Sequence, residues 1–271
     1  MNWKNIYRLV VVLLLGVMFL VLGGCSSFDS SNSGSSASTG ATELGNQKIT
    51  VSAAASLQAA LTELKANFIK AHNLKEEQIA INFGGSGTLR QQIEQGAPVS
   101  LFISADEKNM KLLEDKGLVT QVQPFTANSL VLITQQGHEK ITIEQLPQVQ
   151  RLALGTIETV PAGRYAQETL SHLNLWNQVE PCIVYGKDVK SVAAYVAEGS
   201  AEAGFVYKTD ALDLKDKVQI ADTAPAQSHT PIIYPLAVVP KYDNSLTQSF
   251  YTYLTSNEAQ QVLQKYGFTT P

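Results

Sequence analysis

Residues 49–68, with the sequence ITVSAAASLQAALTELKANF, contain a strand that is followed at once by a helix. Residues 48–53 predict the strand, with Ile49 and Val51 on one face. Ser56 is expected to open the helix as its N-cap, and the apolar residues after it recur at helical spacing: Leu57, Ala60, Leu61, Leu64 and Phe68. This stretch therefore predicts a βα unit, the repeating element of α/β folds.

The same unit recurs twice downstream. A strand is predicted at 79–83, and the turn GGSG at 84–87 leads into a helix that stops at Gly96. A third strand at 101–104 precedes a helix at 107–116, which Gly117 closes. Strands that alternate with helices in this way predict a parallel sheet with helices on its faces.

The second half of the chain continues the alternation. Strands are predicted at 129–134, 151–155, 183–185, 203–207 and 232–239, and helices at 163–173, 189–198 and 245–266. No internal sequence repeat is visible. Domains usually hold roughly 100–200 residues, so two α/β lobes of similar size fit a chain of 271 residues better than one very wide sheet.

The N-terminus has the features of a bacterial lipoprotein leader. Lys4 and Arg8 precede an apolar run of 14 residues at 9–22, shorter than the roughly 20 residues of a membrane-spanning helix. Residues 1–24 therefore predict a signal peptide. The run ends in Leu-Gly-Gly-Cys, which resembles a lipobox and predicts lipidation at Cys25. The protein is then expected to be extracytoplasmic and anchored to the cell membrane by lipid; the alternative is an ordinary signal peptide with an incidental thiol.

Residues 25–46 are dominated by small and polar residues, with Asp29 and Glu43 as the only charges, and predict a flexible tether. Cleavage before Cys25 leaves 247 residues with 18 basic and 24 acidic side chains, a formal net charge of −6. Such a domain has no overall attraction for nucleic acid, so any anion must be held locally. With Cys25 acylated, Cys182 has no partner for an internal disulfide.

Three junctions between a strand and a helix combine small residues with hydroxyls: AAAS at 53–56, GGSGT at 84–88 and VPAG at 160–163. In parallel α/β sheets, ligands bind at the carboxyl ends of strands, where helix N-termini present unpaired N–H groups and a partial positive charge. Pro161 lacks an N–H, but Ala162 and Gly163 keep theirs. Together the junctions predict an oxyanion site made of main-chain donors.

Other interpretations of these residues remain open. A serine that precedes a helix is more often only an N-cap. No Gly-Lys-Ser/Thr follows residue 84, which argues against a phosphate loop, and Thr88 stands where a nucleophile elbow requires glycine. The four histidines, at 72, 138, 172 and 229, show no metal-ligand or Ser-His spacing, so neither a metal site nor a hydrolase is expected.

Several short motifs follow one another in a specific order: ITVSAAASL at 49–57, FGGSGTL at 83–89, GAP at 96–98 with LFISAD at 101–106, VPAG at 160–163, KDV at 187–189, VY at 206–207, YPLAVV at 234–239 and KYGF at 265–268. With this order and spacing the chain resembles the molybdate-binding proteins of bacterial molybdate ABC transporters over about residues 48–269. The resemblance implies an α/β, two-lobed periplasmic-binding-protein fold, type II-like, with molybdate or tungstate clamped between the lobes.

The resemblance also implies five ligand residues. Ser56 and Ser86 would each offer a hydroxyl and a backbone N–H, Ala162 and Val189 a backbone N–H, and Tyr207 a hydroxyl. Relatives are often serine-rich where 84–87 reads GGSG, a local difference that leaves the matched Ser86 in place. A shell of neutral donors should reject a protonated phosphate, whose own donor would face donors, while sulfate must be excluded by cavity size.

Two arginines lie close to the matched loops. Arg90 and Arg164 are expected to point outward or to pair with carboxylates rather than to bind the anion. A tyrosine at a strand end usually serves packing, but the register of Tyr207 with the family pattern favours a ligand role.

The resemblance further implies that lobe I comprises residues 47–126 and 231–271 and that lobe II comprises 127–230, with the chain crossing near 125–129 and 230–234. The expected function is capture of the anion, closure of the lobes and delivery to an ABC permease, by a monomer that uses no cofactor and is not an enzyme. Two alternatives remain: a binding protein for another tetrahedral oxyanion such as sulfate, and a serine-dependent lipoprotein hydrolase, for which no motif supplies a histidine base.

Overall fold

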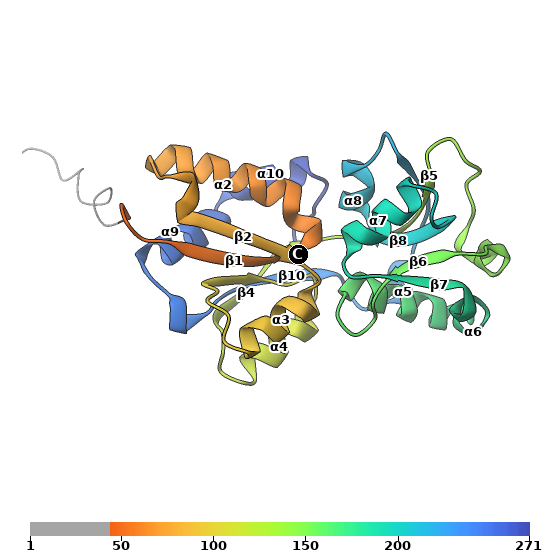
Figure 1. Ribbon diagram of the computed structural model, residues 1–271, viewed down its shortest axis with the longest axis horizontal. Coiled ribbons are helices and arrows are strands. Elements are labelled where there is room, and N and C mark those ends of the chain that lie inside the picture. The colour runs from red at the N-terminus through yellow and green to blue at the C-terminus, as the bar shows by residue number, and fades with distance from the viewer. Residues whose placement is uncertain (1–43) are drawn as a thin grey trace, which may run out of the picture. The chain divides into compact units, whose positions relative to one another are not determined.

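The computed structural model describes residues 44–271; the expected signal peptide, Cys25 and most of the tether lie outside these residues. The strands form two five-stranded sheets (Figure 1). In sheet order, the first contains β2 (Ile79–Gly84), β1 (Ile49–Ala54), β3 (Leu101–Ile103), β10 (Ile233–Val238) and β4 (Thr120–Ala127). The second contains β7 (Ile183–Gly186), β6 (Leu152–Gly155), β8 (Ala203–Tyr207), β5 (Leu130–Gln135) and β9 (Val218–Thr223). We call each sheet with its helices lobe I and lobe II, respectively.

The two sheets share one pattern of strand directions. In lobe I, β1 pairs in parallel with β2 and β3, whereas β10 is antiparallel to both β3 and β4. In lobe II, β6 pairs in parallel with β7 and β8, whereas β5 is antiparallel to both β8 and β9. The three strands of the predicted βα series, β1, β2 and β3, are parallel to one another, as expected. The parallel arrangement does not extend to β10 and β5, which run antiparallel to their neighbours. β5 is the first strand after the chain enters lobe II, and β10 is the first after it returns to lobe I. No crossover helix within the same sheet precedes either strand, so neither is forced to run parallel to its neighbours.

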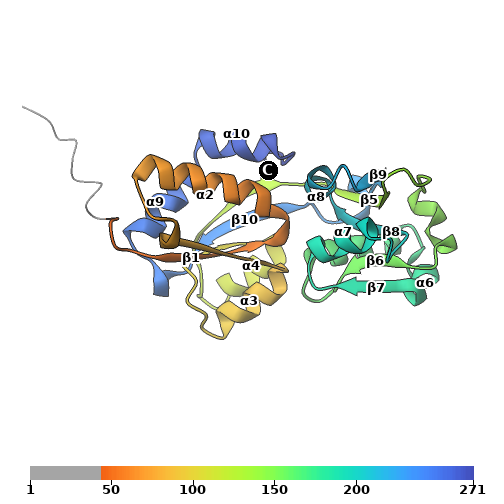
Figure 2. The same ribbon diagram turned by 45° about the horizontal axis from the view of Figure 1, so that its top comes forward.

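The helices of lobe I cover both faces of its sheet, with α2 and α10 on one face and α3 and α4 on the other (Figures 1 and 2). Phe68 of α2 packs edge-on against Phe250 of α9, with ring centroids 4.9 Å apart. The helices of this lobe are α2 (Gln58–His72), α3 (Ser86–Glu94), α4 (Glu107–Glu114), α9 (Ser245–Leu254) and α10 (Asn257–Lys265).

Two details of these helices differ from the sequence predictions. The single helix expected at 245–266 is divided in two, because the Ser256 hydroxyl accepts a hydrogen bond from the Ala259 N–H at 3.3 Å and so caps a new helix, α10. Ser56 does not cap α2. It lies in the 3-10 turn η2 (Ala55–Leu57), and its side chain makes no capping hydrogen bond.

Lobe II carries the helices α5 (Pro161–His172), α6 (Trp176–Val179), α7 (Val189–Ala197) and α8 (Lys208–Asp213). The remaining 3-10 helices of the two lobes are η3 (Glu76–Gln78), η4 (Ile143–Gln148), η5 (Glu180–Cys182), η6 (Ala226–Ser228) and η7 (Pro240–Tyr242).

Sequence patterning missed β4, β9 and α8. Both strands lie at a sheet edge and are largely exposed or half-buried, so they lack the apolar pattern of a buried strand.

The chain passes between the sheets twice, once between β4 and β5 and once between β9 and β10. The two crossing segments lie side by side, since the Asn128 N–H donates to the Ile232 carbonyl at 3.1 Å. Within residues 44–271, no helix is both long and apolar enough to cross a membrane.

Candidate functional site

A small cavity of about 10 Å³ lies where the lobes meet. It is bounded by the carboxyl ends of parallel strands from both sheets and by the helix starts that follow them. The lining residues are Ala54, Ala55, Ser56, Gly84, Gly85, Ser86, Ala105, Val160, Pro161, Val189 and Tyr207. Four of the five expected ligand residues are thus brought together. The fifth, Ala162, is fully buried directly after Pro161 but is not part of the lining.

Three helices begin at or directly beside the lining of this cavity. Ser86 and Val189 are the first residues of α3 and α7, and Ala162 is the second residue of α5. At these positions the N–H has no acceptor within its own helix. In α7 the Asp188 side chain caps the helix by accepting from the Ser191 N–H at 2.8 Å. The cap leaves the Val189 N–H unused.

The two serine hydroxyls are held by different partners. Ser86 Oγ accepts a hydrogen bond from the Ala105 N–H at 2.9 Å, so its own proton remains available to donate. Ser56 Oγ lies 2.9 Å from the Tyr234 hydroxyl, in β10. Among residues 44–271 neither serine hydroxyl hydrogen-bonds a histidine.

Tyr207 supplies a buried donor at the end of β8. Its hydroxyl has no hydrogen-bond partner among the described residues. Burial raises the pKa of this hydroxyl well above its ordinary value of 10, so it keeps its proton. Its ring packs edge-on against Tyr234, with centroids 5.7 Å apart. A buried donor left unpaired costs about 1–3 kcal/mol, so this hydroxyl is suited to a ligand that brings an acceptor.

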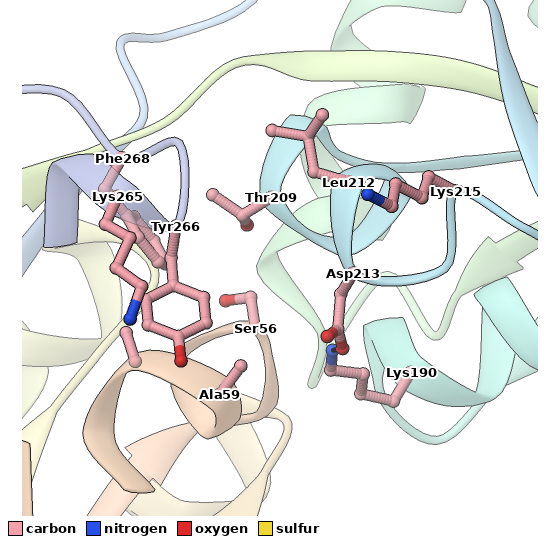
Figure 3. Close-up of a pocket in the computed structure, with 11 residues that line it drawn as sticks. Ser56, Ala59, Lys190, Thr209, Leu212, Asp213, Lys215, Lys265, Tyr266 and Phe268 are labelled. Atoms are coloured by element: carbon pink, nitrogen blue, oxygen red, sulfur yellow. Dashed lines mark hydrogen bonds and ion pairs between the residues drawn. The ribbon is translucent and has the colours of Figure 1, made fainter. Parts of the chain in front are cut away.

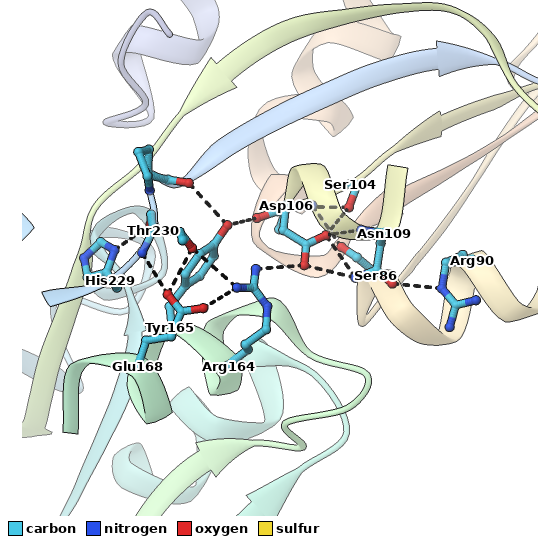
Figure 4. Close-up of polar contacts among 12 residues, drawn as sticks. Ser86, Arg90, Ser104, Asp106, Asn109, Arg164, Tyr165, Glu168, His229 and Thr230 are labelled. Carbon is cyan, nitrogen blue, oxygen red and sulfur yellow. Dashed lines mark hydrogen bonds and ion pairs between the residues drawn. The ribbon is translucent and has the colours of Figure 1, made fainter. Parts of the chain in front are cut away.

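Within residues 44–271, no charged side chain lines the cavity. Arg164 instead forms an ion pair with Asp106 at 3.1 Å, pairs with Glu168, and lies 4.5 Å over the Tyr165 ring (Figure 4). Asp106 belongs to lobe I and Arg164 to lobe II, so this pair joins the lobes. The expectation that Arg164 pairs with carboxylates is confirmed.

Asp106 is almost completely buried, with 1% of its side chain exposed. It caps α4 by accepting from the Asn109 N–H at 2.9 Å, and it immediately follows Ala105 in the cavity wall. Arg90, the other arginine near the loops, donates to Asn109 Oδ1 at 2.9 Å and pairs with Glu94. Both arginines are therefore engaged beside the cavity rather than in it.

Glycines on both sides of Ser86 let lobe II approach closely. A Cβ on Gly87 would lie 2.7 Å from Thr159 Cα, and one on Gly85 would lie 2.9 Å from the Thr159 carbonyl oxygen. The Gly87 N–H donates to that oxygen at 2.9 Å. The glycine-rich loop therefore forms part of the contact between the lobes.

A larger hollow of about 340 Å³ adjoins the cavity and shares Ser56 with it (Figure 3). Three lysines line it, at positions 190, 215 and 265, against one carboxylate, Asp213. Lys190 pairs with Asp213 at 2.7 Å, whereas Lys215 has no ion-pair partner within residues 44–271.

Sequence patterning missed three residues around the site. Ala105 had a usable signal, since it follows a parallel strand at the same sheet edge as the serines. Asp106 directly precedes the predicted helix at 107–116 and caps it, which is a local signal. Its pairing with Arg164 and the contact of Tyr234 with Ser56 join distant parts of the chain and have no local signature. In the described part of the chain, no cluster of three or more His, Cys, Asp or Glu residues could hold a metal ion.

Comparison with known protein families gives a match over residues 49–269 to a family described as bacterial extracellular solute-binding protein. The chain belongs to this family. The solute-binding protein is 43% identical over 256 residues to YvgL of Bacillus subtilis, provisionally named as a substrate-binding lipoprotein of an ABC transporter; the match covers 93% of this chain and 94% of YvgL. It is 38% identical over 232 residues to the molybdate-binding protein ModA of Escherichia coli, covering 82% and 89% of the two chains.

Among solved structures, the solute-binding protein superposes on the periplasmic molybdate-binding protein of Azotobacter vinelandii with a TM-score of 0.73. The match covers 83% of this chain and 100% of the other at 22% sequence identity. Together with the two sheets described above, this likeness confirms the expected two-lobed periplasmic-binding-protein fold.

Proposed function

We propose that this solute-binding protein captures molybdate, and tungstate of the same shape, in the cavity between its lobes. The donors would be the hydroxyls of Ser56, Ser86 and Tyr207 and the backbone N–H groups at positions 56, 86, 162 and 189. The observation that carries the proposal is the buried Tyr207 hydroxyl, which faces a neutral, donor-lined cavity without a partner of its own. The 38% identity to ModA supports molybdate as the anion.

Neutral donors would select the anion by its protonation and its size. A fully deprotonated tetrahedral anion offers only acceptors to the N–H and O–H groups around it. A protonated phosphate would place a donor against donors, which leaves buried polar groups unpaired. Sulfate carries no proton but is smaller than molybdate, so the spacing of the donors must distinguish the two.

Binding would require the lobes to part and close again. A volume of about 10 Å³ accommodates roughly one water molecule, so an anion with four oxygens enters only when the lobes separate. Lys215, which lines the hollow beside Ser56 and has no ion-pair partner within residues 44–271, would attract it. Lobe I, taken as residues 47–126 and 231–271, supplies Ser56 and Ser86. Lobe II, taken as 127–230, supplies the other donors, so a bound anion favours the closed form.

The remaining parts of the proposal concern delivery. The protein would act as a monomer, tethered to the outer face of the membrane by lipid on Cys25, and would pass the anion to an ABC permease in the same membrane. Mass spectrometry of the mature protein tests the anchor. We expect a diacylglycerol adduct on Cys25, and its absence from a Cys25→Ser variant; an unmodified wild-type thiol would contradict the anchor.

Calorimetric titration of the mature protein with molybdate, tungstate, sulfate and phosphate tests the function. We expect molybdate and tungstate to bind at least about 100-fold more tightly than sulfate. A molybdate concentration 100 times its Kd should raise the free energy of unfolding by about 2.7 kcal/mol. Calorimetry is preferable to tryptophan fluorescence, because the mature chain has only Trp176, which lies in α6 away from the cavity. Equal stabilisation by sulfate would overturn molybdate as the ligand.

A further inference from the structure

A chain of polar side chains leads from the crossover between the lobes to the cavity. Asn128, in the segment between β4 and β5, places its Nδ2 3.4 Å from the Tyr234 hydroxyl. That hydroxyl lies 2.9 Å from Ser56 Oγ. Tyr234 is fully buried and does not line the cavity. Its ring packs against Tyr207, but its hydroxyl reaches the site through Ser56.

The direction of each hydrogen bond follows from the amide of Asn128. Its Oδ1 accepts from the Ser129 N–H at 2.9 Å, which turns Nδ2 toward Thr209 Oγ1 at 2.9 Å and toward Tyr234. An amide nitrogen only donates, so the Tyr234 oxygen is the acceptor and its proton points to Ser56 Oγ. Ser56 then accepts from Tyr234, and its own proton is left for the cavity. Burial raises the pKa of Tyr234 well above 10, so the phenol keeps the proton that it donates.

We propose that Asn128 and Tyr234 are positioning residues that hold the Ser56 hydroxyl as a donor toward the cavity, and that they thereby set the discrimination against protonated oxyanions. This inference rests on the proposed function of the cavity. We call the chain of hydrogen bonds from Asn128 through Tyr234 to Ser56 the relay. A serine hydroxyl that is free to rotate can donate or accept, so without the relay Ser56 would turn a lone pair toward the proton of a hydrogen phosphate. The relay prevents this because the Ser56 oxygen already accepts the Tyr234 proton.

Ser86 provides an internal contrast. Its acceptor side is occupied by the Ala105 N–H, a backbone group that no side-chain substitution removes. Ser56 depends on side chains from both crossings of the chain. Asn128 also contacts both lobes, through Thr209 in lobe II and Tyr234 in lobe I, so the direction of the Ser56 proton depends on how the lobes are joined.

The test uses Tyr234→Phe in the full mature protein, titrated with molybdate, sulfate and phosphate over the pH range in which phosphate gains a proton. We expect molybdate affinity to fall about 3- to 10-fold and the molybdate-to-sulfate ratio to stay within threefold, since neither anion carries a proton. The molybdate-to-phosphate ratio should fall at least 10-fold, and further as the pH is lowered. Tyr242→Phe is the matched control, because its hydroxyl bonds the Gly96 carbonyl away from the cavity; it should change none of these values.

An Asn128→Asp variant reverses the relay. Its carboxylate would accept the Tyr234 proton, so Ser56 would donate to Tyr234 and present lone pairs to the anion. We expect molybdate affinity to fall 30-fold or more. Because the effect travels through the phenol, the double variant Asn128→Asp/Tyr234→Phe should bind molybdate more tightly than Asn128→Asp alone.

Two results would overturn the relay. The first is an unchanged molybdate-to-phosphate ratio in Tyr234→Phe, which includes phosphate binding that stays undetectable while molybdate binds. The second is a double variant that binds molybdate no more tightly than Asn128→Asp. The wild-type titration stands apart from both outcomes. If wild-type protein binds no molybdate, the proposed function fails by itself, whatever the variants show.

Discussion

Two neighbouring regions at the boundary between the lobes use opposite chemistry. The cavity is lined by neutral groups, and its Tyr207 hydroxyl has no partner within the described chain. Beside it, Asp106, Arg164 and Glu168 form a charged cluster in which the carboxylates and the guanidinium pair with one another. Charge is used to hold the lobes together, whereas uncharged donors remain free for an anion. In an acidic protein this separation would make the proposed binding site independent of net charge.

The largest expected effect comes from preventing the lobes from meeting at the cavity. In Gly87→Ala the new Cβ would lie 2.7 Å from Thr159 Cα, so closure is blocked and molybdate affinity should fall about 100-fold or more, on the order of 3 kcal/mol. Alanine is favoured over glycine inside a helix by roughly 0.5–1 kcal/mol, so the ligand-free melting temperature should not fall. Calorimetry measures the molybdate affinity, and thermal melting measures the melting temperature of the ligand-free protein. Thr88→Ala, an exposed substitution in the same turn, is the control; unchanged affinity in Gly87→Ala would argue against this contact.

Removing a donor from the cavity should have the next largest effect. Tyr207→Phe deletes a hydrogen bond to a charged ligand, worth about 1.5–3 kcal/mol, so molybdate affinity should fall roughly 10- to 100-fold. The ligand-free protein should be as stable as wild type or more so, because an unpaired buried hydroxyl is lost. Chemical denaturation measures the stability of the ligand-free variant, and titration of the same samples measures its molybdate affinity. Reduced stability with normal affinity would mean that the hydroxyl serves the fold and not the anion.

Breaking the charged cluster should affect binding less, and equally for all anions. Arg164→Gln removes the interlobe ion pair and leaves Asp106 buried without its counter-charge. Molybdate and sulfate affinities should both fall about 3- to 10-fold. Adding Asp106→Asn should restore part of the loss, since asparagine still caps α4 but carries no charge. A loss above 100-fold that is specific to molybdate would instead identify Arg164 as a ligand.

The smallest effect on binding is expected at Asp210, a buried carboxylate 3.3 Å from Lys190. Burial raises the pKa of Asp210 from 3.8 to about 6, against the opposing charge of Lys190. Between about pH 4 and 6 this carboxyl group therefore holds a proton more often in the folded protein than in the unfolded chain. As the pH rises through this range, the group lowers the free energy of unfolding by on the order of 3 kcal/mol. Urea unfolding at several pH values should show that Asp210→Asn loses this slope, while molybdate affinity changes less than threefold. An unaltered slope would assign the pH dependence to other groups.

Local sequence patterns predicted the parts of the site that are built locally. Ser86 lies at a strand-to-helix junction, where apolar periodicity and small residues mark both the strand end and the helix start. The helix start at Val189 was also predicted, but its place among the expected ligand residues rests on the resemblance alone. The position of Ser56 was anticipated for the same reason as that of Ser86, but its role as a cap was wrong. Its hydroxyl is held by Tyr234, 178 residues away in sequence, and such a contact arises only when the chain returns to lobe I.

Fold details were missed where burial is partial. The edge strands β4 and β9 show little apolar alternation, and α8 is only six residues long. The break between α9 and α10 depends on one serine cap inside an otherwise helical pattern. The interlobe pair of Asp106 and Arg164 joins residues 58 apart, from different lobes, and its partners became evident only once the lobes were placed together.

The position of β10 between β3 and β4 has a consequence for the order in which the protein can fold. All five strands of lobe II lie within residues 130–223, so lobe II is one continuous segment. The sheet of lobe I is not joined between β3 and β4 until residues 233–238 are present. A chain that emerges with its N-terminus first would therefore hold β3 and β4 without their shared neighbour β10 until almost the whole sequence has emerged. Lobe II can pair its strands earlier, although it comes later in the sequence.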